Sequence, residues 1–328
     1  MYIESFFPTA FKFLKLALIS PRFDPEPIER VRSQILSSIR QNSESPGAIA
    51  SKALLKKLFP EHPYGQPGSG TEESVSAITR KDLVTFSKDR LAKNNLIIGV
   101  VGDISPQTLK TTLDDVFGDL PAEATSWEIP EVKTESNGFT LVIEKNIPQS
   151  SIVFADEGLQ RSHPDFYAAY LMNYILGGGG FTSRLYNTIR EKQGLAYSVY
   201  SSLHPLEKTG LLIGGAGTSN ARVSETLRLL RHEWVRMADG GVTQKELSDA
   251  KTYQTGSYPL RFGSSGSIAT MLVSIQLDNL GINYINRRND LIEGVSIKAV
   301  NRIAKTLLRP DRLNIVVVGK PKGVESKP

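Results

Sequence analysis

The chain has 328 residues, of which 40% are hydrophobic and 22% charged, so it is long enough to bury a large core and to form about two domains. Its net charge of +5 comes from basic residues dispersed among acidic ones, without a basic run that would follow a phosphate backbone, so we expect no nucleic-acid binding. The chain contains no cysteine, which excludes disulfides and suits either a cytoplasmic or a periplasmic protein. We expect a cytoplasmic location, and the periplasm stays open if an upstream signal is missing.

The opening segment, residues 1–25, is rich in apolar side chains. Lys12 and Lys15 lie inside its apolar stretch rather than ahead of it, and no small-residue cleavage pattern follows, which argues against a secretory signal. The segment is also too short and too charged to span a bilayer, so we expect no membrane insertion. Its pattern predicts an amphipathic or buried helix.

An internal repeat divides the chain. Residues 91–102 align without a gap on residues 308–319, and both segments read as the end of a helix followed by a hydrophobic strand that ends in glycine. Between them, residues 126–138 form a polar linker. We therefore predict two related α+β domains, at residues 1–125 and 139–328.

The second domain shows a clear order of elements. Residues 139–146 and 150–158 predict an opening pair of strands, followed by a helix from about Asp165. Two further strands come after the middle of the chain, and a mostly helical stretch from about residue 221 to 308 precedes a last strand. This order favours an antiparallel sheet packed with helices on one side.

A run of four glycines interrupts the helical pattern of this domain: Gly177, Gly178, Gly179 and Gly180. Glycine permits positive φ and a close approach of backbone to a ligand, although such a run is equally typical of a helix-breaking turn. No Gly-Lys-Ser or Gly-Lys-Thr follows, so the run does not predict nucleotide binding. Thr182 or Ser183 can cap the next helix.

An arginine and a tyrosine follow at a defined spacing. The pattern predicts a helix that ends just after Arg190 and is closed by Gly194 in a left-handed conformation. From residue 195 to 204 the side chains alternate, which predicts a strand with Tyr197 and Val199 on one face. Arginine offers a fork of N–H donors to peptide carbonyls, and a tyrosine hydroxyl can donate to a developing oxyanion. The alternative is that Arg190 neutralises a helix end and Tyr197 packs in the sheet.

The run RLYNTIREKQGLAYSVYS, residues 184–201, is similar to the C-terminal halves of the pitrilysin or insulinase-like peptidases, family M16. Residues 20–42, 58–91 and 94–103 resemble the latter part of the zinc-bearing domain of that family, so the resemblance covers the chain from about residue 21 to 319. It implies that the first domain is incomplete at its N-terminus. In the family, an arginine and a tyrosine seven positions later contact the bound peptide and support the tetrahedral intermediate, and Arg190 and Tyr197 match those positions.

The zinc site of that family is missing from this sequence. The family uses an HxxEH helix and a distant glutamate, whereas the histidines here are too far apart to form the motif: His62, His163, His204 and His232. We interpret all four as turn, boundary or surface residues. Ser38 stands where the third ligand would fall, and a neutral hydroxyl is a poor ligand for zinc. We therefore expect no metal in this chain and zinc in a partner subunit.

The resemblance implies a non-catalytic, peptide-binding partner in a heterodimer with an HxxEH-bearing M16 subunit. Arg190 and Tyr197 would then act in trans on a peptide substrate, and the run from Gly177 to Gly180 would form a flexible loop that contacts it. A proteolytically silent structural or assembly subunit, resembling the core subunits of the family, is the alternative from another class. A third possibility is a peptidase with an unrecognised site.

Overall fold

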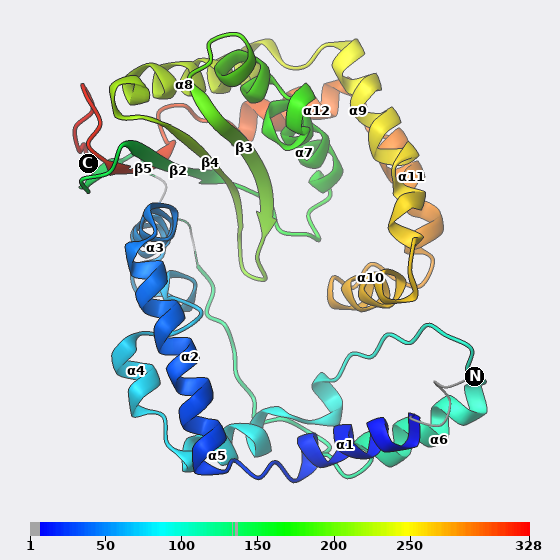
Figure 1. Cartoon of the computed structure of the whole chain (residues 1–328). Helices are drawn as coiled ribbons and strands as arrows, with labels where there is room; N and C mark the ends of the chain where they lie inside the picture. The colour runs from blue at the N-terminus through cyan, green and yellow to red at the C-terminus, as the bar shows by residue number, and fades with distance from the viewer. Residues whose placement is uncertain (1–6, 133, 135–136) are drawn as a thin grey trace. The chain divides into compact units, whose positions relative to one another are not determined.

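The protein is described here by a computed structural model, which covers residues 7–132, 134 and 137–328 (Figure 1). The chain divides into two compact units, each assembled from separate stretches: unit 1 comprises Met1–Arg40, Ser69–Glu128 and Arg261–Gly281, and unit 2 comprises Gln41–Gly68, Ile129–Leu260 and Ile282–Pro328. These units are defined by contacts within the folded chain, so the domain boundaries expected at residues 125 and 139 stay a prediction. Residues 133, 135 and 136 of the expected linker lie outside the described residues.

Helices are the only regular secondary structure in the part of unit 1 that the structure describes. Its helices are α1 (Phe7–Ile19), α2 (Pro25–Glu44, whose end belongs to unit 2), α4 (Glu72–Ala77), α5 (Arg80–Arg90), α6 (Pro106–Phe117) and α10 (Ser265–Leu277). The expected opening helix is confirmed as α1, which packs on α6 through ion pairs from Lys15 to Asp115 and Asp119 at 3.2 and 3.0 Å. It is not a buried helix, because the Phe13 side chain is 67% exposed.

Capping side chains explain where two of these helices begin. The Thr71 hydroxyl accepts a hydrogen bond from the Ser74 backbone N–H, and the Ser74 hydroxyl accepts one from the Thr71 N–H in return. Thr79 and Asp82 form the same reciprocal box at the start of α5. Each box satisfies two backbone donors that the first helical turn leaves without a partner.

The first copy of the sequence repeat does not form the expected strand. No strand is assigned to residues 96–102, and the side chains of Leu96 and Val100 are 38% and 40% exposed. The segment lies instead against α10, where the backbone of Gly99 approaches that of Ala269 so closely that a Cβ would stand 2.6 Å from the Ala269 carbonyl oxygen. A strand needs a neighbouring strand for its backbone hydrogen bonds, and no described segment of unit 1 supplies one.

Unit 2 is built on a sheet of five strands: β1 (Thr140–Glu144), β2 (Gln149–Glu157), β3 (Ala196–Pro205), β4 (Gly210–Ser219) and β5 (Asn314–Gly319). Their order in the sheet is β1-β5-β2-β4-β3; β1 runs parallel to β5, and the other neighbours are antiparallel. The expected opening strands form, but β5 lies between them, so they are not a pair. β5 is buried at every residue, as expected for a strand in the middle of a sheet.

Helices cover both faces of this sheet. The helices of unit 2 are α3 (Pro46–Leu58), α7 (Phe166–Asn173), α8 (Val223–Gly240), α9 (Gln244–Gly256), α11 (Tyr284–Glu293) and α12 (Ile297–Leu307), of which α9 and α11 pack on α7 and on each other. On one face, Ile152 and Phe154 of β2 join the large core formed with α7, α8 and α12. On the other, Val153 and Ala155 pack with α3, which comes from a segment that the sequence places in the first domain. The fold is therefore α+β with a mainly antiparallel sheet, and α3 adds a helix on its second side.

Among the described helices, none combines the length and the apolar character needed to cross a bilayer.

Candidate functional site

Arg190 and Tyr197 lie on either side of one tight turn. Arg190 is the last residue but one of the π-helical turn Tyr186–Glu191, and β3 begins six residues after it at Ala196. Gly194 adopts φ +59°, and its N–H donates to the Arg190 carbonyl oxygen at 2.9 Å. Across the same turn, the Leu195 N–H donates a hydrogen bond to the Ile189 carbonyl oxygen at 3.0 Å. The expected arrangement of a helix end, a left-handed glycine and a strand is confirmed, although the helix is of the π type.

Tyr197 is the extra residue of a β-bulge. Ala196 pairs with Thr218 of β4, while Ser198 already pairs with the next residue, Gly217, so Tyr197 has no partner of its own. A bulge resets the alternation of side chains along a strand and re-aims the extra one. Consequently Tyr197 is 78% exposed whereas Val199 is 3% exposed. The prediction that these two side chains share a face is wrong for this reason.

Both residues line one cavity of about 500 Å³, which we call the Arg–Tyr cavity. Its remaining lining comes from the start of β2, the turn before β3, the end of β4 and the residue before α8: Gln149, Gly194, Leu195, Ala196, Gly217, Thr218, Ser219 and Arg222. Because β2, β4 and β3 are neighbours in the sheet, the sheet itself brings these segments together. Sequence analysis missed Gln149 and Arg222, since no motif links either of them to the arginine and tyrosine.

The polar groups of the Arg–Tyr cavity are mainly donors. The Arg190 guanidinium lies 4.8 Å from the centre of the Tyr186 ring, a cation–π contact that holds the side chain half-buried. No aspartate or glutamate lines the cavity, and neither Arg190 nor Arg222 forms an ion pair with a described residue. The guanidinium groups of both arginines, the Tyr197 phenol and the Gln149 amide can therefore donate hydrogen bonds to carbonyl oxygens or to anionic oxygens here.

The glycine run borders a different cavity, of about 470 Å³, which we call the glycine cavity. Its lining includes Gly177, Gly178 and Gly180 but not Gly179, together with Phe166, Tyr170, Asn173, Tyr174, Tyr200, Ser201, Ser202, Leu203 and Gln254. Burial of Tyr174 is the main cause that raises the pKa of its phenol. The structure thus brings Arg190 and Tyr197 together, but it places the glycines at a second point along β3.

The glycine run is held by packing. Gly177 is buried, and a Cβ on it would stand 2.3 Å from Ser201 Oγ and 2.6 Å from the Ser201 backbone nitrogen. Ser201 Oγ in turn donates to Asn173 Oδ1 at 2.7 Å. Thr182 and Ser183 do not cap the next helix; their hydroxyls donate to the carbonyl oxygens of the last two glycines of the run. Gly177 is therefore needed for the close approach of this turn to β3, and a substrate role for the run stays a prediction.

β3 is an edge strand of the sheet. Within the described residues, no backbone hydrogen bond joins the outer edge of β3 to another segment. Both cavities border this strand, one at Tyr197 and the other at Tyr200 to Leu203. An unpaired strand edge can accept an extended peptide as an additional strand.

The four histidines do not form a site. His62 is 7% exposed; its Nε2 lies 3.0 Å from the Pro130 carbonyl oxygen, and its Nδ1 accepts from the Tyr64 N–H. The ring is thus a buried link between two segments, not a surface residue. His163, His204 and His232 are exposed, as is Ser38 on α2. Over the part of the chain that the structure describes, no three His, Asp or Glu side chains gather closely enough to hold a metal ion, so its residues do not fit zinc.

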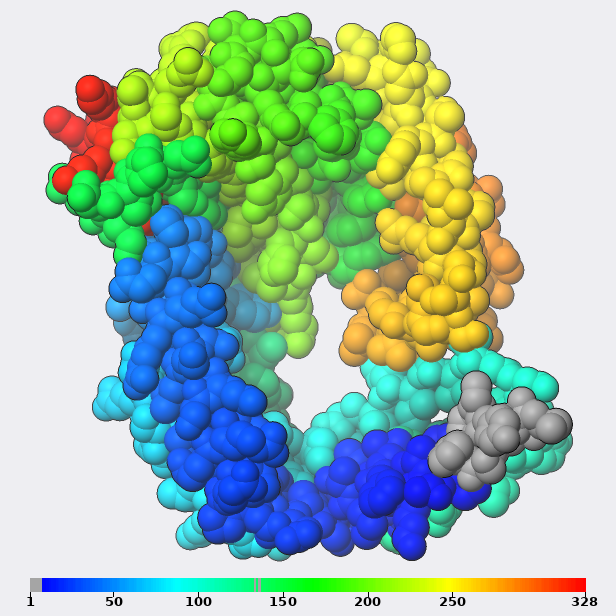
Figure 2. Space-filling model, in the orientation of Figure 1, coloured from blue at the N-terminus to red at the C-terminus, as the bar shows by residue number. Residues whose placement is uncertain are grey.

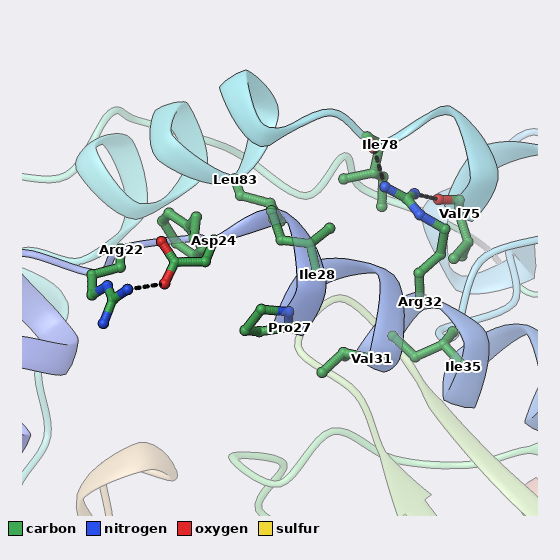
Figure 3. Close-up of a pocket in the computed structure, with 11 residues that line it drawn as sticks. Arg22, Asp24, Pro27, Ile28, Val31, Arg32, Ile35, Val75, Ile78 and Leu83 are labelled. Carbon is green, nitrogen blue, oxygen red and sulfur yellow. Dashed lines mark hydrogen bonds and ion pairs between the residues drawn. The ribbon is translucent and has the colours of Figure 1, made fainter.

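A third cavity, of about 460 Å³, is an apolar groove in unit 1. Residues of α2, α4, α5 and the loop before α2 line it, and Figure 3 shows Ile28, Val31 and Ile35 of α2 along one side. α2 has no buried residue and is visible along its length in Figure 2, drawn in blue. The Arg32 guanidinium donates to the carbonyl oxygens of Val75 and Ile78, so its donors are already used at the end of α4. The groove thus offers apolar contact, and the only other charged groups in its lining, Arg22 and Asp24, form an ion pair with each other.

A comparison with protein-family models matches residues 77–253 to the model described as the peptidase M16 inactive domain. This stretch includes all the residues that line the Arg–Tyr cavity and, except for Gln254, all those that line the glycine cavity.

Two bacterial proteins and one solved structure resemble the chain over most of its length. It is 28% identical to the non-peptidase homolog YmxG of Helicobacter pylori, over 98% of this chain and 74% of that protein. It is 27% identical to the uncharacterized zinc protease YmxG of Bacillus subtilis, over 88% of this chain and 70% of that protein. The crystal structure of a peptidase M16 inactive domain from Pseudomonas fluorescens superposes with a TM-score of 0.88 at 30% identity, covering 98% of this chain and 76% of that one.

Proposed function

Because this chain belongs to the peptidase M16 family, as a member of the type described by its inactive domain, we propose that it is a non-catalytic, peptide-binding subunit of a two-chain zinc peptidase. The partner is an M16 subunit that bears the HxxEH motif and holds the zinc ion. This chain binds the peptide substrate with Arg190 and Tyr197. The observation that carries the proposal is the cavity that these two side chains share beside a free strand edge.

The edge of β3 supports a binding mode for the peptide. An extended peptide that pairs with β3 as an added strand gains backbone hydrogen bonds that do not depend on its sequence. Tyr197 and Ser201 are four residues apart on β3, which corresponds to about 13 Å at the rise of an extended strand. A peptide of roughly five residues would thus reach both the Arg–Tyr cavity and the glycine cavity.

The chemistry of Arg190 and Tyr197 supports a role in trans. The Arg190 guanidinium is held against Tyr186 and has no ion-pair partner among the described residues, so its donors are open to peptide carbonyl oxygens. The Tyr197 hydroxyl stands on a strongly exposed side chain. It can donate to the oxygen of the scissile carbonyl as that oxygen gains negative charge. The zinc ion of the partner would supply the activated water, and no described residue of this chain takes that part.

The test has two stages. First, the full chain is purified at native level from its source cells, and we expect an HxxEH-bearing homologue in equal amount. Second, peptide hydrolysis by the assembled pair is measured for Arg190→Ala and Tyr197→Phe. Loss of one donor to a developing oxyanion lowers kcat by about 10²-fold, so we expect reductions of that order with assembly intact.

Two exposed residues away from the cavity provide matched controls. Arg228→Ala removes an arginine of α8 that pairs with Glu225, and Tyr253→Phe removes a hydroxyl from α9. Neither should change hydrolysis. If Arg190→Ala and Tyr197→Phe behave like these controls, while omission of the whole chain abolishes hydrolysis, the chain is a structural subunit and the role in trans is wrong.

A further inference from the structure

The Arg–Tyr cavity contains a second arginine to which the proposed function assigns no role. Arg222 precedes α8, and its Nη1 donates to the Gly194 carbonyl oxygen at 2.9 Å. The N–H of the same glycine donates to the Arg190 carbonyl oxygen. Both arginines are therefore tied to one turn, although they are far apart in the sequence. Because Gly194 adopts a left-handed conformation, this turn has a defined geometry.

The positive charge of this cavity is not neutralised from within. The Arg222 guanidinium uses one of its donors on Gly194 and makes no other hydrogen bond or ion pair to a described residue, so the rest of its fork is open. Arg190 stacks on Tyr186. The other polar lining residues are neutral, and the Thr218 hydroxyl already donates to the Leu195 carbonyl oxygen at 2.5 Å. The positive charge and the open donors of the two arginines therefore favour binding of an anion that has more than one acceptor oxygen.

We propose that the Arg–Tyr cavity binds a carboxylate group of the peptide and that Arg222 selects for it. This inference rests on the proposed function, since it assumes a peptide beside β3. A carboxylate matches the planar fork of arginine with two parallel hydrogen bonds, which a backbone carbonyl cannot do. The group is supplied either by an acidic side chain or by the C-terminal carboxylate of the peptide. Arg190 then contacts the peptide itself, and Arg222 decides which peptides are preferred.

The test measures the dissociation constants of three fluorescent eight-residue peptides with the full chain, by anisotropy. The first peptide has blocked ends and neutral side chains, the second has one interior glutamate and blocked ends, and the third is neutral with a free C-terminal carboxylate. A charge-assisted hydrogen bond to arginine changes affinity by about tenfold, so we expect the second or the third peptide to bind about tenfold more tightly than the first. Which of the two gains affinity identifies the source of the carboxylate.

Variants of Arg222 assign the preference to that residue. Arg222→Gln should remove the preference, because it removes the positive charge, and leave the affinity for the neutral peptide unchanged, because that peptide has no carboxylate for Arg222 to bind. Arg222→Lys should retain part of the preference through its charge. Arg228→Gln, on the exposed face of α8, is the control and should have no effect.

Two results overturn the inference in distinguishable ways. Equal affinities for the three peptides, or a preference that survives Arg222→Gln, would show that the cavity does not select a carboxylate, while peptide binding itself stands. Failure of all three peptides to bind would remove peptide binding by this chain and the carboxylate preference with it.

Discussion

Asp156 is a buried carboxylate whose charge should make the stability of unit 2 depend on pH. The residue is 1% exposed. Burial raises its pKa from 3.8 to about 6, although three N–H groups donate to its oxygens and oppose this change: those of Arg309 and Glu157 and the indole of Trp234. Because the folded state binds this proton more tightly than the unfolded chain, the contribution of Asp156 to the free energy of unfolding is largest below about pH 4. That contribution is lost as the pH rises through 6.

The size of the effect follows from the shift in pKa. The difference between 3.8 and about 6 corresponds to about 3 kcal/mol, most of which falls between pH 4.5 and 7.5. Asp156→Asn removes the titration. The amide also replaces one acceptor oxygen by a donor, but that cost is the same at every pH. The difference in unfolding free energy, wild type minus Asp156→Asn, should therefore fall steadily over this range.

Urea unfolding followed by tryptophan fluorescence measures this difference. The chain has two tryptophans, Trp127 in unit 1 and Trp234 in unit 2, so a Trp127→Phe background makes the signal report on unit 2. Each pH is measured for both proteins, which cancels the titration of the histidines. A difference that stays flat from pH 4.5 to 7.5 would refute the reasoning. A difference that rises with pH would show that the three N–H donors outweigh burial.

Two further substitutions test the packing and the buried charge of unit 2. Gly177→Ala should destabilise the protein by about 1–3 kcal/mol because the new Cβ overlaps Ser201, whereas Gly240→Ala, with no atom within 4 Å of its Cβ, should be close to neutral; thermal unfolding of both variants checks this. Arg184→Met should cost roughly 1–3 kcal/mol in urea unfolding at pH 7, because the partly buried Glu246 loses its charged partner at 2.7 Å and keeps only its hydrogen bonds from Thr243. Burial raises the pKa of Glu246, but Arg184 and Thr243 together outweigh it and lower the pKa to about 2, so this stability is present above about pH 4.5 and is lost as pH falls towards 2. An Arg184→Met variant as stable as the wild type at pH 7 would contradict the assignment.

The turn between Arg190 and Tyr197 was predictable because it depends on neighbours in the sequence. A helical pattern, a glycine that tolerates positive φ and an alternating run follow one another within about twenty residues, and each acts locally. The same is true of the opening helix. The family relationship was also visible in the sequence, because it is carried by ordered blocks of residues rather than by contacts in space.

The repeat shows where local pattern stops being sufficient. Residues 96–102 and 313–319 have nearly the same hydrophobic pattern, yet one is an extended segment beside α10 and the other is the buried strand β5. The difference arises from pairing: β5 has β1 and β2 on its two sides, and residues 96–102 have no described strand beside them. An alternating hydrophobic pattern favours an extended conformation, but a strand forms only where a neighbouring strand can pair with its backbone.

The sequence by itself determined the family, the α+β class, the order of elements from residue 139 onward and the placing of Arg190 near a helix end with Tyr197 in the next strand. Only the tertiary structure decided that a bulge turns Tyr197 outward, that β5 separates β1 from β2, that the glycines line a cavity of their own and that Arg222 joins Arg190. The physical reason is the same in each case. Strand register and the meeting of distant segments depend on contacts across the sheet, and no residue pattern within a single segment records them.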